Sequence, residues 1–173
     1  IDVLSASIYD DTIAWYENDG SESFTAHTIS TSADGAWSVY AVDLDGDDDI
    51  DVLSASADDD KIAWYENDGS ESFTAHDITT SADYAYSVYA VDVDGDGDMD
   101  VLSASAGDDK IAWYENDGSE SFTAATITSS ADGASSVYAV DMDGDGDMDV
   151  LSASYNDDKI AWYENDGSES FTA

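Results

Sequence analysis

The stretch Asp92-Val93-Asp94-Gly95-Asp96-Gly97-Asp98-Met99-Asp100 places a carboxylate at every second position. Carboxylates this close together repel one another and raise each other's pKa unless a cation lies among them. A hard divalent cation takes about six to eight oxygens, and a loop supplies them with acids at positions 1, 3 and 5, a glycine at position 6 and a backbone carbonyl at position 7. The stretch therefore predicts a calcium loop, with an acidic turn that binds no metal as the alternative.

The helical version of such a loop, the EF-hand, is not expected. An EF-hand places a bidentate glutamate at position 12 and has a helix on each side, whereas position 12 here is Ser103. The flanking segments 87–91 and 101–105 are short and rich in β-branched, aromatic and small residues, which is typical of strands. The loop is thus expected to be a turn between two strands.

The sequence is an internal repeat. The segment Ile1-Asp2-Val3-Leu4-Ser5-Ala6-Ser7 returns, nearly unchanged, at Ile50, Met99 and Met148, a period of 49 residues. The 173 residues therefore form a single repeat region, 1–173, with three full repeats, 1–49, 50–98 and 99–147, and a partial repeat, 148–173. A repeat of this length determines the architecture, because each unit must bury its apolar face against its neighbours.

Four segments of each repeat have the character of strands. In the second repeat they are 51–56, 61–66, 72–78 and 87–91, and a turn-forming cluster, 67–70, separates the second from the third. No helical periodicity is present and no proline interrupts a strand. Four antiparallel strands in a repeat of roughly 40 to 50 residues are typical of a β-propeller blade. We expect an all-β fold, a β-propeller of four-stranded antiparallel blades with about 3.5 repeats in this chain.

Counting blades and counting strands predict different assemblies. Two chains of about 3.5 repeats would sum to seven blades, which suggests a closed dimer. The chain, however, starts with the second strand of a blade and ends in a fourth strand, so the first blade would lack its inner strand. We give the strand count more weight because hydrogen-bonded ladders must match, and we expect a partial propeller or a fragment of a longer array.

A tryptophan and a tyrosine recur at one place in every repeat. Inter-blade packing is the expected role, because a large ring in each blade is what a repeated core needs. A stacking platform for sugars is the alternative. The residues are Trp15, Trp64, Trp113 and Trp162, followed by Tyr16, Tyr65, Tyr114 and Tyr163.

These motifs resemble a known family. The pattern Asp-x-Asp-Gly-Asp-Gly-Asp-x-Asp, a hydrophobic strand, then Ile-Ala-Trp-Tyr-Glu-Asn-Asp-Gly and Ser-Phe-Thr is similar to the FG-GAP-like or VCBS repeat, over essentially the whole chain. The chain lacks the Phe-Gly and Gly-Ala-Pro of the integrin-type version and has Leu-Ser-Ala-Ser in place of the latter. The resemblance implies a propeller, usually seven-bladed, with calcium between the first and second strands of a blade. Members of the family include adhesion receptors, lectins and non-catalytic parts of surface enzymes.

The resemblance extends the calcium loop to three repeats. Positions 1, 3, 5 and 9 would bind Ca²⁺ through carboxylates and position 7 through its backbone carbonyl. The expected calcium residues are Asp43, Asp45, Asp47, Asp49 and Asp51; Asp92, Asp94, Asp96, Asp98 and Asp100; and Asp141, Asp143, Asp145, Asp147 and Asp149. In the first loop position 6 is Asp48 instead of glycine, so we expect a more strained turn there.

The few differences among the copies gather in two connections that an up-and-down blade places opposite the calcium loops. They fall at Ile8, Ala57, Ala106 and Tyr155; at Tyr9, Asp58, Gly107 and Asn156; at Gly35, Tyr84 and Gly133; and at Trp37, Tyr86 and Ser135, of which the last two sets precede the inner strand. Exposed loops tolerate drift, which is one explanation. Aromatic rings also stack on sugars and anchor interfaces. The candidate ligand-binding residues are Tyr9, Trp37, Tyr84, Tyr86 and Tyr155.

Composition limits the classes of molecule that the protein is expected to bind. The net charge of −39 comes from 42 acids against three lysines and no arginine, and a polyanion repels nucleic acids and anionic membranes. No apolar run is long enough for membrane insertion. There is no cysteine, so disulfides are excluded. The charge favours a salty, divalent-rich extracellular setting; if the protein is secreted, its leader has been removed or lies outside this sequence.

Catalysis is not expected, because nearly every polar group appears three or four times whereas a catalytic site is usually unique. His27 and His76 are replaced by Ala125 in the third copy, which argues against a catalytic or metal role for them. Two functions remain. One is a calcium-binding extracellular module for adhesion or binding, with glycans or cell-surface proteins as partners. The other is a structural subunit that self-associates with other chains of the same protein into a filament or matrix.

Overall fold

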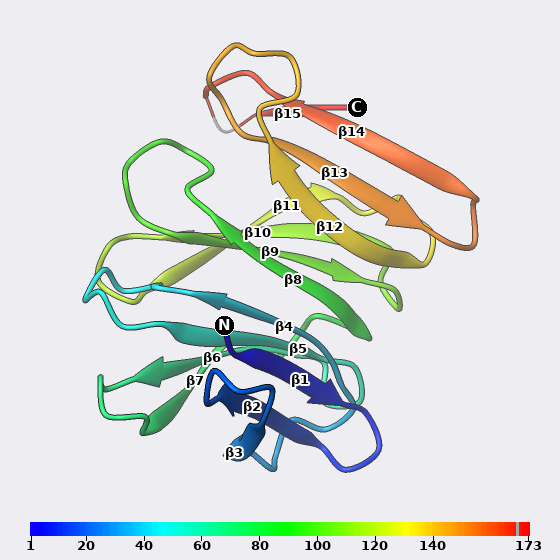
Figure 1. The fold of residues 1–173 in the computed structure, drawn as a ribbon. Helices are drawn as coiled ribbons and strands as arrows, with labels where there is room; N and C mark the ends of the chain where they lie inside the picture. The colour runs from blue at the N-terminus through cyan, green and yellow to red at the C-terminus, as the bar shows by residue number, and fades with distance from the viewer. Residues whose placement is uncertain (169) are drawn as a thin grey trace.

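We describe the protein from a computed structural model that covers residues 1–168 and 170–173. In this part of the chain every regular element is a β-strand, and the strands form four antiparallel sheets. Figure 1 shows the sheets following one another in chain order, from blue at the N-terminus to red at the C-terminus. Among these residues no helix has the length and apolar character that a membrane span requires. The all-β fold predicted from the sequence is confirmed.

Each sheet is an up-and-down blade. The first contains β1 (Val3–Ser7), β2 (Thr12–Asn18) and β3 (Phe24–Ser30). The second contains β4 (Ala36–Val42), β5 (Asp51–Ser56), β6 (Lys61–Asn67) and β7 (Phe73–Thr79). The third contains β8 (Ala85–Val91), β9 (Asp100–Ser105), β10 (Lys110–Asn116) and β11 (Phe122–Thr128). The fourth contains β12 (Ala134–Val140), β13 (Asp149–Ser154), β14 (Lys159–Asn165) and β15 (Phe171–Thr172).

The hairpin turns follow from local chemistry. After β6 the side chain of Asn67 accepts a hydrogen bond from the N–H of Gly69 at 3.2 Å, and Asp68 accepts one from the N–H of Ser70 at 2.9 Å. Gly69 has a φ of +73°, a conformation that glycine adopts without steric penalty. Asparagine, aspartate and glycine thus fix the reversal that pairs β6 with β7.

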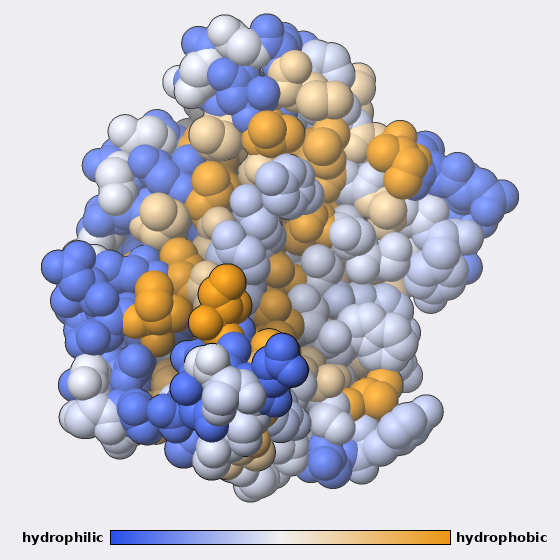
Figure 2. Space-filling model, in the orientation of Figure 1, coloured by the Kyte–Doolittle hydropathy of each residue, from blue (hydrophilic) through white to orange (hydrophobic). Residues whose placement is uncertain are grey.

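The inner strands β4, β8 and β12 lie next to one another. Their tyrosines form a row, which we call the tyrosine ladder: Tyr40 and Tyr89 have ring centroids 4.9 Å apart, and Tyr89 and Tyr138 are 4.8 Å apart. Figure 2 shows apolar surface gathered down the middle of the face seen in Figure 1, with hydrophilic surface along its left side.

The core lies between successive sheets. Trp64 on β6 is 1% exposed and packs in one cluster with Val101 and Ala112 of the next sheet. Trp113 is 2% exposed and meets Phe171 of the fourth sheet edge-on, with centroids 6.3 Å apart. For these two tryptophans the predicted inter-blade packing is confirmed.

The propeller is partial, as the strand count predicted: among residues 1–168 and 170–173 the first sheet is β1-β2-β3, and no strand of this part of the chain pairs with the free edge of β1. A cleft of about 340 Å³ lies between the first two blades, with Leu4, Trp15 and Val52 among its lining residues. The counterparts of these residues one repeat later enclose the buried side chain of Leu44. At the next interface Leu44 therefore fills the place that corresponds to this cleft.

The expected strand positions need one correction. In the second repeat the inner strand begins at Ala85 instead of Ser87. The register shifts between Ala85 and Ser87, so Tyr86 is the extra residue of a β-bulge. Trp37 has the same place in β4. Both aromatic residues therefore lie inside the inner strand, whereas the sequence placed them before it.

Candidate functional site

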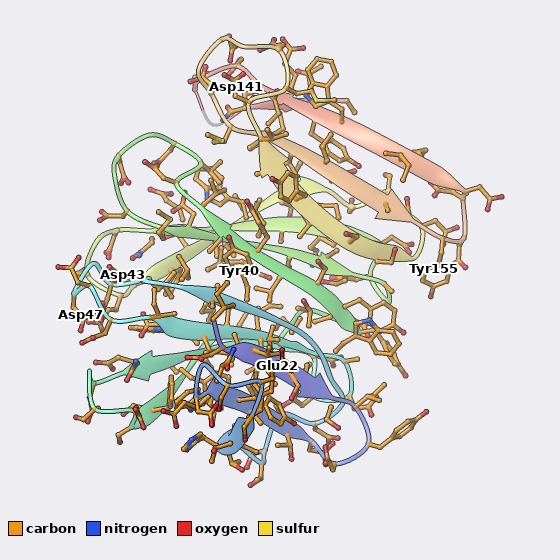
Figure 3. The ribbon with its side chains drawn as sticks, in the orientation of Figure 1. Glu22, Tyr40, Asp43, Asp47, Asp141 and Tyr155 are labelled. Atoms are coloured by element: carbon orange, nitrogen blue, oxygen red, sulfur yellow. The ribbon has the colours of Figure 1, made fainter. Side chains whose placement is uncertain are left out.

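The three acidic loops connect the inner strand of a blade to its second strand. They span 43–51 between β4 and β5, 92–100 between β8 and β9, and 141–149 between β12 and β13. Figure 3 shows Asp43, Asp47 and Asp141 on one side of the molecule and Tyr155 on the opposite side. The acidic loops and the divergent aromatic residues therefore lie at opposite ends of the blades, as predicted.

Each loop brings three carboxylates together. In each group, ligand oxygens from the three side chains lie within 4.8 Å of one another. Positions 1 and 3 contribute in every loop; position 9 joins them in the first loop, and position 5 joins them in the other two. The groups are Asp43, Asp45 and Asp51; Asp92, Asp94 and Asp96; and Asp141, Asp143 and Asp145.

Backbone hydrogen bonds hold these carboxylates in place. Both oxygens of Asp92 accept, one from the N–H of Gly95 at 2.7 Å and one from the N–H of Gly97 at 3.0 Å. Asp96 accepts from the N–H of Asp98 at 2.9 Å. The backbone of the loop therefore curves around the carboxylates of positions 1 and 5. The turn needs a positive φ at position 6, which is +103° at Gly97 and +74° at Asp48, and the strain predicted for the first loop is confirmed by that aspartate in a glycine conformation.

The carboxylate at position 9 connects the loop to the rest of the blade. Asp100 is 0% exposed and accepts hydrogen bonds from the N–H of Val93 at 3.0 Å and the N–H of Asn116 at 2.8 Å. Asp51 and Asp149 make the same two bonds. This connection between loop and hairpin was missed by the sequence argument. The constant spacing of 16 residues from the aspartate to the asparagine of Glu-Asn-Asp-Gly was the available signal.

At position 7 the side chain points away from the loop. A Cβ built on Gly118 would collide with the carboxylate of Asp98, and the same holds for Gly69 with Asp49. These carboxylates lie against the β6–β7 and β10–β11 turns. The side chain at position 7 is therefore directed at the neighbouring turn, and the role of the position 7 backbone carbonyl stays a prediction.

Burial and mutual repulsion perturb these acids. Burial raises the pKa of Asp100 to about 6, against the opposing effect of its backbone hydrogen bonds, and the charge of Asp94 adds to the rise. Burial likewise raises the pKa of Asp51. Desolvation, followed by the charges of neighbouring loop carboxylates, raises the pKa of Asp45. An opposite charge among such groups favours their ionised forms.

The donor set fits a hard divalent cation. Carboxylate and backbone carbonyl oxygens are what Ca²⁺ prefers, in a flexible geometry of about six to eight ligands, whereas tightly bound Zn²⁺ favours nitrogen and sulfur. The gathered carboxylates are those of positions 1 and 3 with position 9 in the first loop and position 5 in the other two; ligation by the remaining carboxylates and by the carbonyl of position 7 stays a prediction. A bound cation would offset the repulsion among the carboxylates and so stabilise the turn between inner and second strands.

The loops are also joined to the neighbouring blade. The Asn165 side chain donates to the backbone oxygen of Val93 at 3.2 Å, and Asn116 donates to that of Leu44 at 3.5 Å. Each bond runs from the end of a third strand to the acidic loop of the preceding blade. The geometry of the loop and the stacking of blades are thus coupled.

At the opposite end, four of the five candidate aromatic residues gather. Trp37 and Tyr86 stack with centroids 4.5 Å apart at 30°. Tyr84, Tyr86 and Tyr155 line a cavity of about 190 Å³. Tyr9 is 96% exposed on the β1–β2 hairpin and is not among the residues lining that cavity.

The histidines pack against the tryptophans. His27 stacks on Trp15 with centroids 4.4 Å apart and His76 on Trp64 at 4.7 Å. His76 also lies 2.9 Å from Glu66. Neither histidine belongs to a three-carboxylate group.

The repeat matches a known protein family. The family model described as the FG-GAP-like repeat matches residues 1–54, 43–103, 92–152 and 141–173. Together these matches cover the whole chain, and each contains all or part of an acidic loop. No curated protein matches the chain in sequence.

Proposed function

The chain belongs to the FG-GAP-like repeat family, and from that premise we propose that it is a calcium-binding, non-catalytic module for extracellular binding or adhesion. The observation that carries the proposal is the set of three loops in which carboxylate oxygens lie within 4.8 Å of one another. FG-GAP-like repeats are often calcium-binding, which supports the same assignment.

Calcium has a structural role in this proposal. The ion would be held by loops 43–51, 92–100 and 141–149, where Asp51, Asp100 and Asp149 already connect each loop to its hairpin. Binding at a loop would stabilise the junction between the inner and second strands and, through Asn116 and Asn165, the stacking of blades. The end that carries Trp37, Tyr84, Tyr86 and Tyr155 is then free for ligands, for which glycans and cell-surface proteins are the classes expected from the family.

The test is thermal unfolding in millimolar Ca²⁺ and after chelation. We expect the melting temperature to fall on chelation, and to fall less in the double variant Asp92→Asn, Asp94→Asn, which has one loop fewer to lose. Asp10→Asn, which removes one carboxylate outside the loops, is the control for charge removal and should keep the full calcium effect. A melting temperature that does not change on chelation contradicts a structural role for calcium.

A self-assembling structural subunit is a second candidate, and one observation favours it. At the two ends of the array, residues are exposed whose counterparts in other repeats are buried. Ile160 is 78% exposed, whereas its counterpart Ile62 is 0% exposed, and Val3 is 50% exposed, whereas its counterpart Val52 is 3% exposed. If two chains met head to tail, these side chains would be buried as their counterparts are at the interfaces between blades. Head-to-tail contacts that do not close into a ring produce filaments. Light scattering tests it: Val3→Asp and Ile160→Asp should each block growth, and an equimolar mixture of the two should give a discrete dimer. Failure of the mixture to dimerise argues against head-to-tail contact.

A further inference from the structure

The cavity at the aromatic end contains a residue in an unusual backbone conformation. Tyr84 has a φ of +51° where its counterparts Gly35 and Gly133 have +68°. Its N–H donates to the carboxylate of Asp60 at 3.1 Å, and its carbonyl accepts from Ala106 at 3.0 Å. These bonds hold a bulky residue in a glycine conformation. Such strain clusters at ligand-binding sites and gives reason to ask what Tyr84 binds.

The rings come from two neighbouring blades. Tyr84 and Tyr86 belong to the start of the third blade, and Tyr155 to the β13–β14 hairpin of the fourth. Together with Ala106 and Gly107 they line the cavity of about 190 Å³. Tyr86 is fixed by its stack on Trp37, 4.5 Å away, while Tyr84 and Tyr155 are 50% and 54% exposed. The cavity is open to solvent and already has its aromatic walls in place.

The charge around this cavity is negative. A Cβ built on Gly107 would overlap the carboxylate of Asp83, which therefore lies directly against a lining residue. The pKa of Tyr86 is raised by burial first, then by Tyr155, Tyr84 and the charge of Asp58. The three lysines each contact an aspartate next to their own strand: Lys61 with Asp59, Lys110 with Asp108, and Lys159 with Asp157.

We propose that this cavity binds a quaternary ammonium or methylated amine group. Ring faces attract such cations, and desolvation strengthens the attraction. The charge of −39 concentrates cations at the surface and repels phosphates and carboxylates. The volume is below the roughly 300 Å³ at which sites for drug-sized ligands begin, so the cavity takes a head group and not an extended chain. The proposal deepens the proposed binding function by naming a ligand class for one site on that surface.

A titration with choline, followed by the ring resonances of tyrosine in NMR spectra, tests the charge requirement. The control ligand is 3,3-dimethylbutan-1-ol, which has the shape of choline without the charge. In calcium and at constant ionic strength, we expect saturable shifts for choline and binding weaker by at least about tenfold for the alcohol. Equal affinity for the two, or no saturation with choline, overturns the proposal.

The repeats supply replacements that fold at each position. Tyr86→Ser introduces the residue of Ser135, Tyr155→Ala that of Ala57, and Tyr84→Gly that of Gly35. Each should weaken choline binding by at least about tenfold, while Tyr84→Gly should raise the melting temperature, because it relieves the strained φ. Loss of binding in a more stable protein cannot come from unfolding.

Tyr9→Ala is the matched control, since Tyr9 is 96% exposed outside the cavity, and it should leave choline affinity unchanged. If all variants bind choline equally, the cation is held only by the general negative charge, and the proposal fails. Saturable binding of N-acetylglucosamine in place of choline, lost in the same variants, would assign the cavity to a sugar instead. A calcium-dependent melt with no choline binding would leave the proposed function intact and overturn this inference alone.

Discussion

The side chain of Asn165 donates a hydrogen bond to the backbone oxygen of Val93, 3.2 Å away and 72 positions earlier in the chain. Val93 is position 2 of the acidic loop of the third blade, and Asn165 ends β14 of the fourth. The N–H of Asn165 meanwhile donates to Asp149 in its own loop at 2.8 Å. One residue therefore connects two acidic loops.

Removing this connection should destabilise the protein. In Asn165→Ala the buried carbonyl of Val93 loses its partner, and we expect the free energy of unfolding to fall by about 1–3 kcal/mol. Asn18→Ala is the matched control, because Asn18 donates to the carbonyl of Ile1 as Asn165 does to that of Met148, and within the described residues its side chain makes no bond to another blade. Urea unfolding in calcium measures both. A cost at Asn18 equal to that at Asn165 would show that the inter-blade bond adds nothing.

The inter-blade core offers a second matched pair. Ile62 is 0% exposed and Ile160 is 78% exposed, although they occupy the same place in the repeat. We expect Ile62→Ala to cost about 2–5 kcal/mol and Ile160→Ala to stay within about 0.5 kcal/mol. The comparison is made by urea unfolding at low protein concentration. A large cost at Ile160 would mean that this end of the array is covered in solution.

The β6–β7 turn gives a third pair. Gly69 and Gly20 have φ values of +73° and +79°, but a Cβ at Gly69 would collide with Asp49, whereas nothing lies within 4 Å of one at Gly20. Gly20→Ala should cost roughly 1 kcal/mol from backbone strain alone. Gly69→Ala should cost more than Gly20→Ala, because the carboxylate of Asp49 must in addition move away from the β6–β7 turn. Thermal melts of the two variants check this, and equal melting temperatures would mean that Asp49 moves aside freely.

The tyrosine ladder should make stability depend on alkaline pH. Burial, then the neighbouring rings of Tyr40 and Tyr138, raise the pKa of Tyr89 above its usual value of 10.0. The fold therefore favours the neutral phenol, so its contribution is complete below about pH 10 and is lost as pH rises toward the raised pKa. Unfolding free energies measured between about pH 9 and 11.5 should decline less steeply in Tyr89→Phe, by up to about one proton. Tyr9→Phe should leave the profile unchanged; an identical slope in Tyr89→Phe contradicts the expected role of the ladder.

The sequence was sufficient for the architecture because the repeat is so regular. The 49-residue period located the blades, and the alternating aspartates located the loops. Contacts between repeats were not accessible in this way. The sequence does not indicate that Asn165 forms a hydrogen bond with a carbonyl 72 residues away, or that a bulge places Tyr86 inside β8, because both depend on how strands and blades pair and pack.

Differences between copies were informative only in part. Tyr9, Trp37, Tyr84, Tyr86 and Tyr155 were grouped as one candidate ligand set, and the structure brings together all but Tyr9. The position of a residue within the repeat does not show whether its side chain lies between two blades or at the exposed end of the array. Tyr9 lies on the β1–β2 hairpin of the first blade, whereas the residues lining the cavity belong to the third and fourth blades.

The most direct measurement of the central claim is the number of calcium ions bound per chain, by isothermal titration calorimetry of the chelator-stripped protein. Three loops predict three ions, and Asp92→Asn with Asp94→Asn predicts two, while Asp10→Asn keeps three. Binding absent, or a stoichiometry that these loop substitutions do not change, would contradict the assignment of the acidic loops as calcium sites.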